Sequence, residues 1–294
     1  MTATATNVNA AFPSGNANFL LKKAVCRLGT LTVFCAMESR TLQLVLQYDG
    51  SRFAGWQRQP EERTVQGVVE EALERLCERH IAVLGAGRTD AGVHALGQVA
   101  GIRVPDRWTA VEMRRALNAV LPDDVWIVSS QSMKPEFHAR FSAVSRAYRY
   151  LVGTEEETAS PFRRNRELAW KRPIDRQLLD EAAKLILGDR CFLGFAVRGT
   201  APETDDHRCN VYESRWLDRD GGLAFFVKAN RFLHHMVRFL VGTMLDVASG
   251  KRELSEMVAL LEASDNRGVS TPAPAHGLYL EKVEYPGELY LVDP

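Results

Sequence analysis

The apolar residues of this chain outline the order strand–helix–strand–strand–helix–strand twice, and a repeat of this kind allows very few folds. In the first half, leucines alternate with polar residues from Thr41 to Tyr48, as on a half-buried strand. A helix is expected after Thr64 as N-cap, and a second one opens at a capping box of Thr109 and Glu112. The other strands of this half are expected at Ile81–Leu84, Gln98–Val104 and Val125–Val128.

The second half follows the same order. Its strands are expected at Arg146–Val152, Val211–Leu217, Leu223–Ala229 and Gly277–Tyr285, and its main helices at 178–186 and about 231–248. Two such units predict an α+β fold of two ferredoxin-like halves, each with an antiparallel sheet and with helices packed on one side. We expect the boundary between a first subdomain of residues 39–143 and a second of residues 144–294.

Residues 1–38 differ in composition from the rest and are expected to form an extension of the folded part. Up to Met37 they include Lys22, Lys23 and Arg27 but no acidic residue, a composition shared by transit peptides for organelle import. Two other interpretations stay open: a disordered tail, or an upstream start codon with Met37 as the working initiator. We favour these two, and with them a cytoplasmic location. The 5 cysteines include no C-x-x-C pair, which indicates a reducing compartment.

The overall charge does not point to nucleic acid. The 37 basic and 37 acidic residues cancel, whereas phosphate binding draws on an excess of Lys and Arg. One stretch differs, because between Phe137 and Arg176 nine basic residues stand against five acidic ones. Such a stretch is either a solvated face or a nucleic-acid surface. No apolar run approaches the roughly 20 residues that a membrane helix needs, so we expect a soluble protein.

The segment most informative about chemistry is GAGRTDAGVHALGQV, from Gly85 to Val99. Its glycines permit a tight turn, but their spacing is not that of a dinucleotide-binding or P-loop motif. At the tip of this turn, between two expected strands, lies Asp90, two residues after Arg88. A carboxylate beside cations stays ionised at neutral pH and can act as a nucleophile or a base. The alternative is that Asp90 only caps the turn.

This segment resembles the signature of the tRNA pseudouridine synthase I family, also called tRNA pseudouridine synthase A. Further segments resemble that family in the same order: YDGSRFAGWQRQ from Tyr48, RTVQ from Arg63, LNAVLPDDV from Leu117, FHARFSAVSRAYRY from Phe137, FLHHMVRFLVG from Phe232 and AHGLYLEKVEY from Ala275. The resemblance runs from about Thr41 to Tyr285, and agreement of so many motifs in order makes chance negligible. It implies the pseudouridine synthase fold, with the two halves joined around a central catalytic cleft.

The resemblance also implies an activity. Family members isomerise uridine to pseudouridine at positions 38, 39 and 40 of the tRNA anticodon stem-loop, as intramolecular transferases that use no cofactor and no metal. The aspartate of the R-T-D triplet, here Asp90, is the catalytic residue. It either attacks C1′ of the ribose or removes the C2′ proton, and both routes break the N1–C1′ glycosidic bond. The freed uracil then turns and rejoins the ribose through C5.

Three further residues acquire substrate-binding roles from the resemblance. The target uridine has to be flipped out of its stack, and Arg88 is expected to fill the vacated place or to pair with phosphate. Tyr148 matches the tyrosine that packs against the target base and helps remove the C5 proton. Arg238 matches the arginine that pairs with the catalytic aspartate, so we expect an Asp90–Arg238 ion pair. The alternatives are a surface arginine for Arg88, a core aromatic for Tyr148 and an arginine that extends into solvent for Arg238.

One histidine pair is not expected to bind a metal, and two segments depart from the family pattern. His234 and His235 are adjacent and would point about 100° apart on a helix, so we expect no metal ion shared between them. The sequence also departs from the family pattern at Arg190-Cys191-Phe192 and at Thr204–Arg208, which puts outer tRNA contacts in doubt.

Family members work as homodimers with tRNA lying across both subunits, which would combine two modest basic patches into one groove. A catalytically inactive tRNA-binding or chaperone homologue is the main alternative, and intact Asp90, Tyr148 and Arg238 speak against it. An unrelated nucleosidase or glycosidase is a third hypothesis. Such enzymes normally pair two carboxylates, whereas the loop offers only Asp90.

Overall fold

The computed structural model describes residues 24–28, 31–35, 39–197, 199–200, 204–263 and 265–291. The chain divides into two compact units, Met1–Glu38 and Ser39–Pro294. In the first unit, the backbones of β1 (Ala24–Leu28) and β2 (Leu31–Cys35) form an antiparallel hairpin. The expectations for the rest of this extension, including Met37 as initiator, lie outside the described residues.

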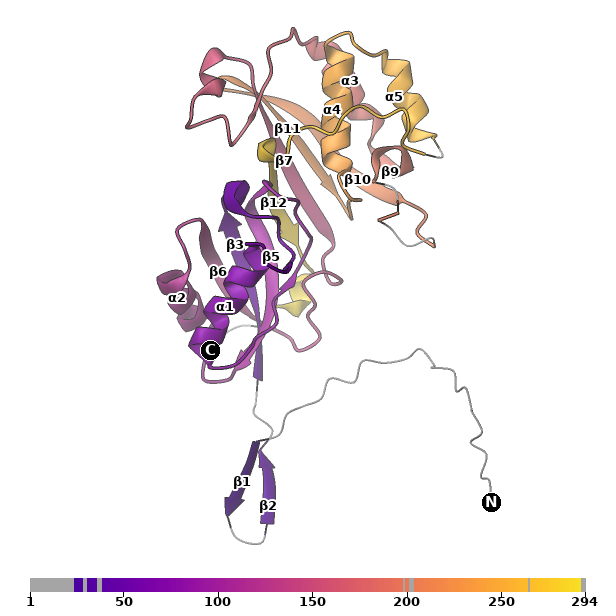
Figure 1. The fold of residues 1–294 in the computed structure, drawn as a ribbon. Coiled ribbons are helices and arrows are strands. Elements are labelled where there is room, and N and C mark those ends of the chain that lie inside the picture. Colours follow the sequence, from indigo (N-terminus) through magenta and orange to yellow (C-terminus); the bar gives the residue numbers. More distant parts are fainter. Residues whose placement is uncertain are drawn as a thin grey trace, which may run out of the picture. The chain divides into compact units, whose positions relative to one another are not determined.

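The second unit begins with a half of ferredoxin-like topology (Figure 1). Its elements are β3 (Ser39–Tyr48), α1 (Val65–Cys77), β4 (Leu84–Gly85), β5 (His94–Pro105), α2 (Ala110–Val120) and β6 (Val125–Met133). The strands lie in the order β6-β3-β5-β4, and all their pairings are antiparallel. Both predicted helix starts are confirmed, since Thr64 accepts a hydrogen bond from the Gly67 N–H and Thr109 forms a capping box with Glu112.

The second half repeats this arrangement. Its elements are β7 (Ser145–Gly153), β8 (Leu168–Ala169), α3 (Arg176–Leu185), β9 (Gly188–Cys191), β10 (Arg208–Arg219), β11 (Gly222–Ala229), α4 (Met236–Ala248), α5 (Leu254–Leu261) and β12 (Leu278–Glu284). The strand order is β12-β7-β11-β10-β9, in which β9 is an edge strand that the hydrophobic pattern did not predict. Helix α3 packs against α4 and α5.

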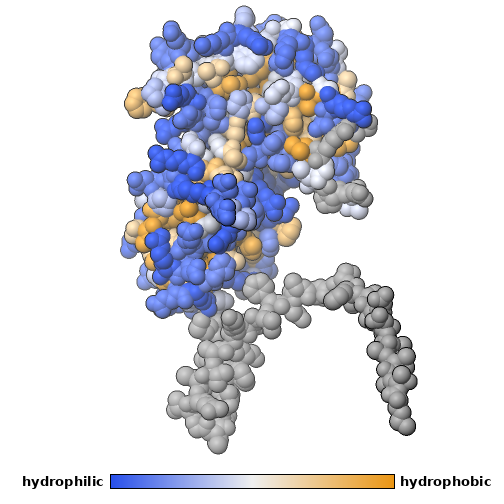
Figure 2. Space-filling model, in the orientation of Figure 1, coloured by the Kyte–Doolittle hydropathy of each residue, from blue (hydrophilic) through white to orange (hydrophobic). Residues whose placement is uncertain are grey.

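Strands β5 and β12 join the two halves, because they pair in parallel with Tyr279 opposite His94. The result is one mixed ten-stranded sheet, with one hydrophobic core in each half. The predicted α+β class is confirmed, and the two antiparallel sheets are continuous at this junction. Figure 2 shows hydrophilic residues over most of the visible face of this unit.

The start of α4 differs from the prediction of a helix from about Arg231. The helix begins at Met236, after His235 in a left-handed conformation with φ of 61°. The side chain of Asn230 accepts hydrogen bonds from the backbone N–H groups of Asn210 and Arg231 and so ties the preceding segment to β10. Among the described residues, no helix is long and apolar enough to cross a membrane.

Candidate active site

Asp90 lies on the site loop, Ala86–Val93, which connects β4 to β5 as the sequence indicated. Neighbouring elements hold this loop at Gly87 and at Thr89. The Gln98 side chain donates to Gly87 O at 2.9 Å, and the hydroxyls of Tyr48 and Thr89 are 2.7 Å apart. Such fixed contacts hold the backbone around Asp90 in one conformation before substrate arrives.

A glycine of the first half supports the loop from outside. Gly55 has φ of +101° and approaches the loop so closely that a Cβ here would lie 2.7 Å from Thr89 O. The same oxygen accepts a hydrogen bond from Trp56 N at 3.0 Å. Only glycine allows this approach, because it tolerates positive φ and has no side chain.

Arg146, on β7, bridges the site loop to the second half. Its guanidinium donates to Ala86 O at 3.1 Å and to Asn230 O at 2.9 Å, and also to the carbonyls of Ala143 and Arg140. Burial lowers the pKa of this guanidinium. The guanidinium therefore has four backbone carbonyls as hydrogen-bond acceptors, and Arg146 acts as a structural bridge between the halves.

The expected Asp90–Arg238 ion pair is confirmed. Nη1 of Arg238 donates to Oδ2 of Asp90 at 2.9 Å, and Nε donates to Ala273 O at 2.7 Å. The side chain of Asp90 keeps 23% of its surface exposed and that of Arg238 keeps 15%, so the pair is largely but not wholly removed from water. Arg238 therefore does not extend into solvent, and Asp90 does more than cap a turn.

Two histidines also converge on Asp90, which the sequence analysis did not predict. Nε2 of His234 lies 3.5 Å from one carboxylate oxygen and Nε2 of His235 lies 3.1 Å from the other. The expectation of divergent rings was wrong because both residues precede α4, where the left-handed His235 turns the chain. Burial lowers the pKa of His235, which favours its neutral form.

These three groups also form a possible metal-binding set. Their ligand atoms all lie within 4.8 Å of one another, as two imidazoles and a carboxylate do in many zinc sites. The guanidinium of Arg238 already occupies one carboxylate oxygen and would compete with a cation. No metal is needed to explain the position of Asp90.

Tyr148 lies on β7 between the two hydrophobic cores. Its ring meets Phe232 edge to face, with centroids 5.0 Å apart. Burial raises the pKa of its hydroxyl to about 12, and the charge of Asp90 adds to this shift while Arg146 opposes it. At neutral pH the hydroxyl therefore carries its proton.

Arg88, unlike Arg238, is exposed to solvent on the site loop. Among the described residues it has no ion pair or hydrogen-bond partner. An unpaired guanidinium two residues from Asp90 remains available to a polyanionic ligand. The structure thus pairs Asp90 with Arg238 and, within the described chain, leaves Arg88 unpaired two residues before Asp90.

The basic stretch from Phe137 to Arg176 is less basic in three dimensions than its composition suggested. Several of its cations have internal acceptors: Arg149 pairs with Glu281, Arg163 with Glu167, Arg166 with Asp49 and Arg176 with Asp180. Of the rest, Arg140, Arg164, Lys171 and Arg172 are exposed and have no ion pair within the described part of the chain. Only a minority of these charges can therefore attract phosphate.

His94 is a second residue whose role could not be seen in the sequence. It is buried, with 3% of its side chain exposed, and its ring stacks on Tyr279 at 4.7 Å. Nδ1 accepts the Gly50 N–H at 3.0 Å, so Nε2 carries the proton and donates to Asn165 O at 3.0 Å. The ring thus ties the end of the site loop to both halves.

One of the two departures from the expected pattern, Thr204–Arg208, forms two ion pairs. Arg208 pairs with Asp189 at 3.1 Å across β9 and β10. Asp205 pairs with Arg231, three residues before His234. Arg231 is thereby held by an internal carboxylate.

The chain is similar to known proteins over most of its length. A family model described as tRNA pseudouridine synthase matches residues 44–142 and 182–286. A protein of Latilactobacillus sakei called tRNA pseudouridine synthase A is 39% identical over 246 residues, which cover 83% of this chain and 98% of that protein. Proteins of the same name from Geobacillus sp. and Porphyromonas gingivalis are 40% and 38% identical, each over 84% of this chain and 99% and 98% of their own lengths.

Proposed function

Because the chain belongs to the tRNA pseudouridine synthase family, we propose that its isomerisation of tRNA uridine takes place in the anticodon stem-loop, at positions 38, 39 and 40. Asp90 is the catalytic residue of this proposal. Arg88, Tyr148 and Arg238 bind the substrate. No cofactor takes part.

The observation that supports Asp90 most directly is its set of contacts. Within the described chain, its carboxylate contacts Arg238, His234 and His235 but no second carboxylate. A hydrolytic glycosidase needs an acid and a base or nucleophile on separate carboxyls, usually about 5 to 9.5 Å apart. A single carboxylate beside a guanidinium suits an isomerisation, in which the departing uracil stays in the site and returns to the same ribose.

The surroundings of Asp90 fit each step of this reaction. Arg238 holds the carboxylate in one orientation while it attacks C1′ or removes the C2′ proton. After the N1–C1′ bond breaks, the uracil turns, C5 bonds to C1′, N1 gains a proton and C5 loses one. Tyr148, which keeps its proton at neutral pH, packs against the turning base. Arg88 fills the stack that the flipped uridine leaves.

The remaining parts of the proposal concern assembly. We place the subdomain boundary between residues 143 and 144, just before β7, which pairs with β12 at the junction of the halves. Two copies form a homodimer, across which tRNA lies, because the free cations of one copy are few. The location is cytoplasmic.

The test is release of tritium from [5-³H]uridine-labelled tRNA, because pseudouridine formation replaces the hydrogen on C5. Wild type should release tritium, and Asp90→Asn and Asp90→Ala should not, although both should still bind tRNA. Transcripts with uridine at only one of positions 38, 39 and 40 then show which of them react. A folded wild type that binds several tRNAs without releasing tritium would establish the alternative, an inactive tRNA-binding homologue.

A further inference from the structure

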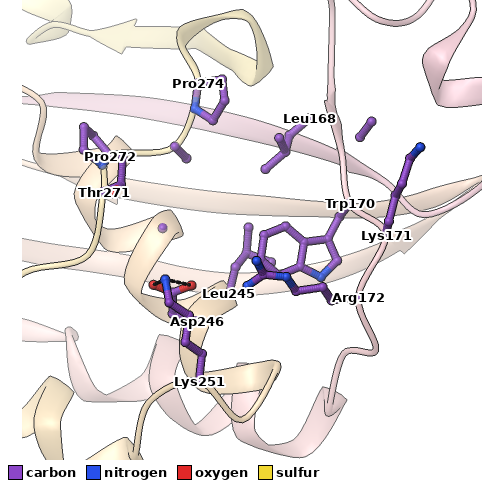
Figure 3. A pocket seen from close by; sticks show the side chains of 13 residues that line it. Leu168, Trp170, Lys171, Arg172, Leu245, Asp246, Lys251, Thr271, Pro272 and Pro274 are labelled. Atoms are coloured by element: carbon purple, nitrogen blue, oxygen red, sulfur yellow. Dashed lines mark hydrogen bonds and ion pairs between the residues drawn. The ribbon is translucent and has the colours of Figure 1, made fainter.

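A cavity of about 370 Å³ lies beside α4, where residues 168–172 and 271–274 approach the helix (Figure 3). Its size is within the range of roughly 300 to 1,000 Å³ usual for small-ligand sites. We call it the Trp170 pocket, after the largest side chain in its wall. None of the residues assigned above to catalysis or uridine binding lines it.

The wall combines an aromatic ring with unpaired cations. The guanidinium of Arg172 lies 5.5 Å from the ring centroid of Trp170, and Lys171 stands between them in sequence. Lys171 and Arg172 are exposed and have no ion pair among the described residues. The one acid of the wall, Asp246, is already paired with Lys251 at 3.0 Å. The unpaired charges of the wall are therefore positive. The pocket suits an anion with a flat apolar part that can lie against the ring.

The pocket is also a direct neighbour of the Asp90–Arg238 pair. Gly242 and Leu245 line it and lie four and seven residues after Arg238, on the same face of α4. Ala273 lines it from the other side and is bonded to Arg238 twice, through Nε to Ala273 O at 2.7 Å and through Ala273 N to Arg238 O at 2.9 Å. One backbone segment therefore separates an occupant of the pocket from the arginine that holds Asp90.

We propose that the Trp170 pocket binds one nucleotide of tRNA other than the reacting uridine, with its base against Trp170 and its phosphate on Lys171 and Arg172. This assignment rests on the proposed function. Aromatic side chains bind bases of any sequence through their flat faces, and unpaired Lys and Arg bind the phosphate that accompanies each base. A purely apolar ligand would leave both cations without a partner.

The test uses the full-length protein and the charge reversal Lys171→Glu with Arg172→Glu. Loss of a phosphate contact should reduce the slope of log Kd for tRNA against log salt by about one. The KM for tRNA should rise about tenfold, because the phosphate contact is lost, while kcat at saturating tRNA should remain near wild type. The matched control is Arg114→Glu with Arg115→Glu, an adjacent basic pair on α2 that lies outside the pocket.

The ring is tested separately, with Trp170→Leu and Trp170→Phe. Trp170→Leu should raise the KM for tRNA. Trp170→Phe should keep the KM close to the wild-type value, because a flat ring is kept. Binding measurements test the pocket even in a protein without turnover, whereas tritium release by wild type tests the proposed function. A salt slope and a KM that change no more in the Lys171/Arg172 variant than in the Arg114/Arg115 control overturn the assignment. The assignment is also overturned if the Lys171/Arg172 variant changes its oligomeric state while its tRNA binding stays unchanged. That result would mean that a second copy of the chain occupies the pocket.

Discussion

Arg238 joins the carboxylate of Asp90 to the backbone at Ala273, through one guanidinium that donates in two directions. Its Nη1 reaches Asp90 Oδ2 at 2.9 Å and its Nε reaches Ala273 O at 2.7 Å. The orientation of the catalytic carboxylate therefore depends on the position of the segment at Ala273, which lies some 180 residues further along the chain.

Arg238→Lys should show whether Asp90 needs only a nearby positive charge or also the planar geometry of the guanidinium. A lysine ammonium keeps the positive charge near Asp90 but lacks the planar fork that holds both acceptors at once. We expect kcat for tritium release to fall about 100-fold, a size typical for loss of one oriented donor in an active site. The control is Arg176→Lys, since Arg176 also joins carboxylates to a backbone carbonyl, at Trp216, but far along the sequence from the site loop. Equal effects of the two substitutions on kcat would contradict a specific role for Arg238.

Gly55→Ala should damage the active site through the site loop. Its φ of +101° makes any side chain strained, at a cost of about 1 kcal/mol or more, and the new Cβ would also meet Thr89 O at 2.7 Å. Gly188→Ala is the matched control, because Gly188 has φ of +85° and nothing within 4 Å of its Cβ position. Both variants should lower Tm, but only Gly55→Ala should also lower kcat. If both change Tm and kcat alike, the contact with Thr89 has no part in catalysis.

Much of this architecture follows from local sequence patterns. The strand at Thr41–Tyr48 and the capping box at Thr109 depend on nearby residues alone, and both are present, although Thr41 and Gln43 are buried along with the leucines. The short strand β9 carries no such pattern, since its residues are polar and largely exposed, and it forms only because β10 offers an edge. The parallel pairing of β5 with β12 is likewise a relation between distant segments that no local period records.

The site shows the same division. Asp90 and Arg238 were paired through the family resemblance, and their contact is present. The approach of His234 and His235 to Asp90 was missed because it depends on one left-handed residue before α4, where a continuous apolar pattern indicated helix. The basic stretch was overrated in part because two of its ion pairs, Arg149–Glu281 and Arg166–Asp49, join residues far apart in sequence.

Chelation should leave the enzyme unchanged, whereas added zinc should inhibit it. EDTA should leave tritium release unchanged, because Arg238 already orients Asp90 without a metal. Added Zn²⁺ should inhibit, because the ligand atoms of Asp90, His234 and His235 lie within 4.8 Å of one another. His234→Gln should raise the Zn²⁺ concentration for half-inhibition by at least about tenfold, since a direct ligand is removed. The same half-inhibition concentration in wild type and variant would place the inhibitory zinc elsewhere.

The last prediction concerns pH and His94. Burial lowers the pKa of this imidazole in the folded protein, even though Asp49 lies 3.3 Å away and favours the charged form. An unfolded histidine titrates near pH 6.5, so between that pH and the lower folded value the unfolded state binds more protons. The stability that His94 contributes is complete above about pH 6.5 and is lost as the pH falls below it. Protonation would also set an N–H of the ring against the Gly50 N–H that it now accepts.

His94→Asn should therefore weaken this dependence on pH. Asparagine can still accept the Gly50 N–H but does not titrate, so at pH 7.5 the variant should lose about 1 kcal/mol, for the bond to Asn165 O. Between pH 6.5 and 5.5 the wild type should lose up to about 1.4 kcal/mol more than the variant per pH unit, measured by urea unfolding. His80→Asn, at an exposed position, is the control and should keep the wild-type slope. His235 and His276 also have lowered pKa values through burial, so some slope should remain in every variant. A wild-type slope in His94→Asn would assign the acid sensitivity to those two residues instead, and the site loop would then not depend on the protonation of His94.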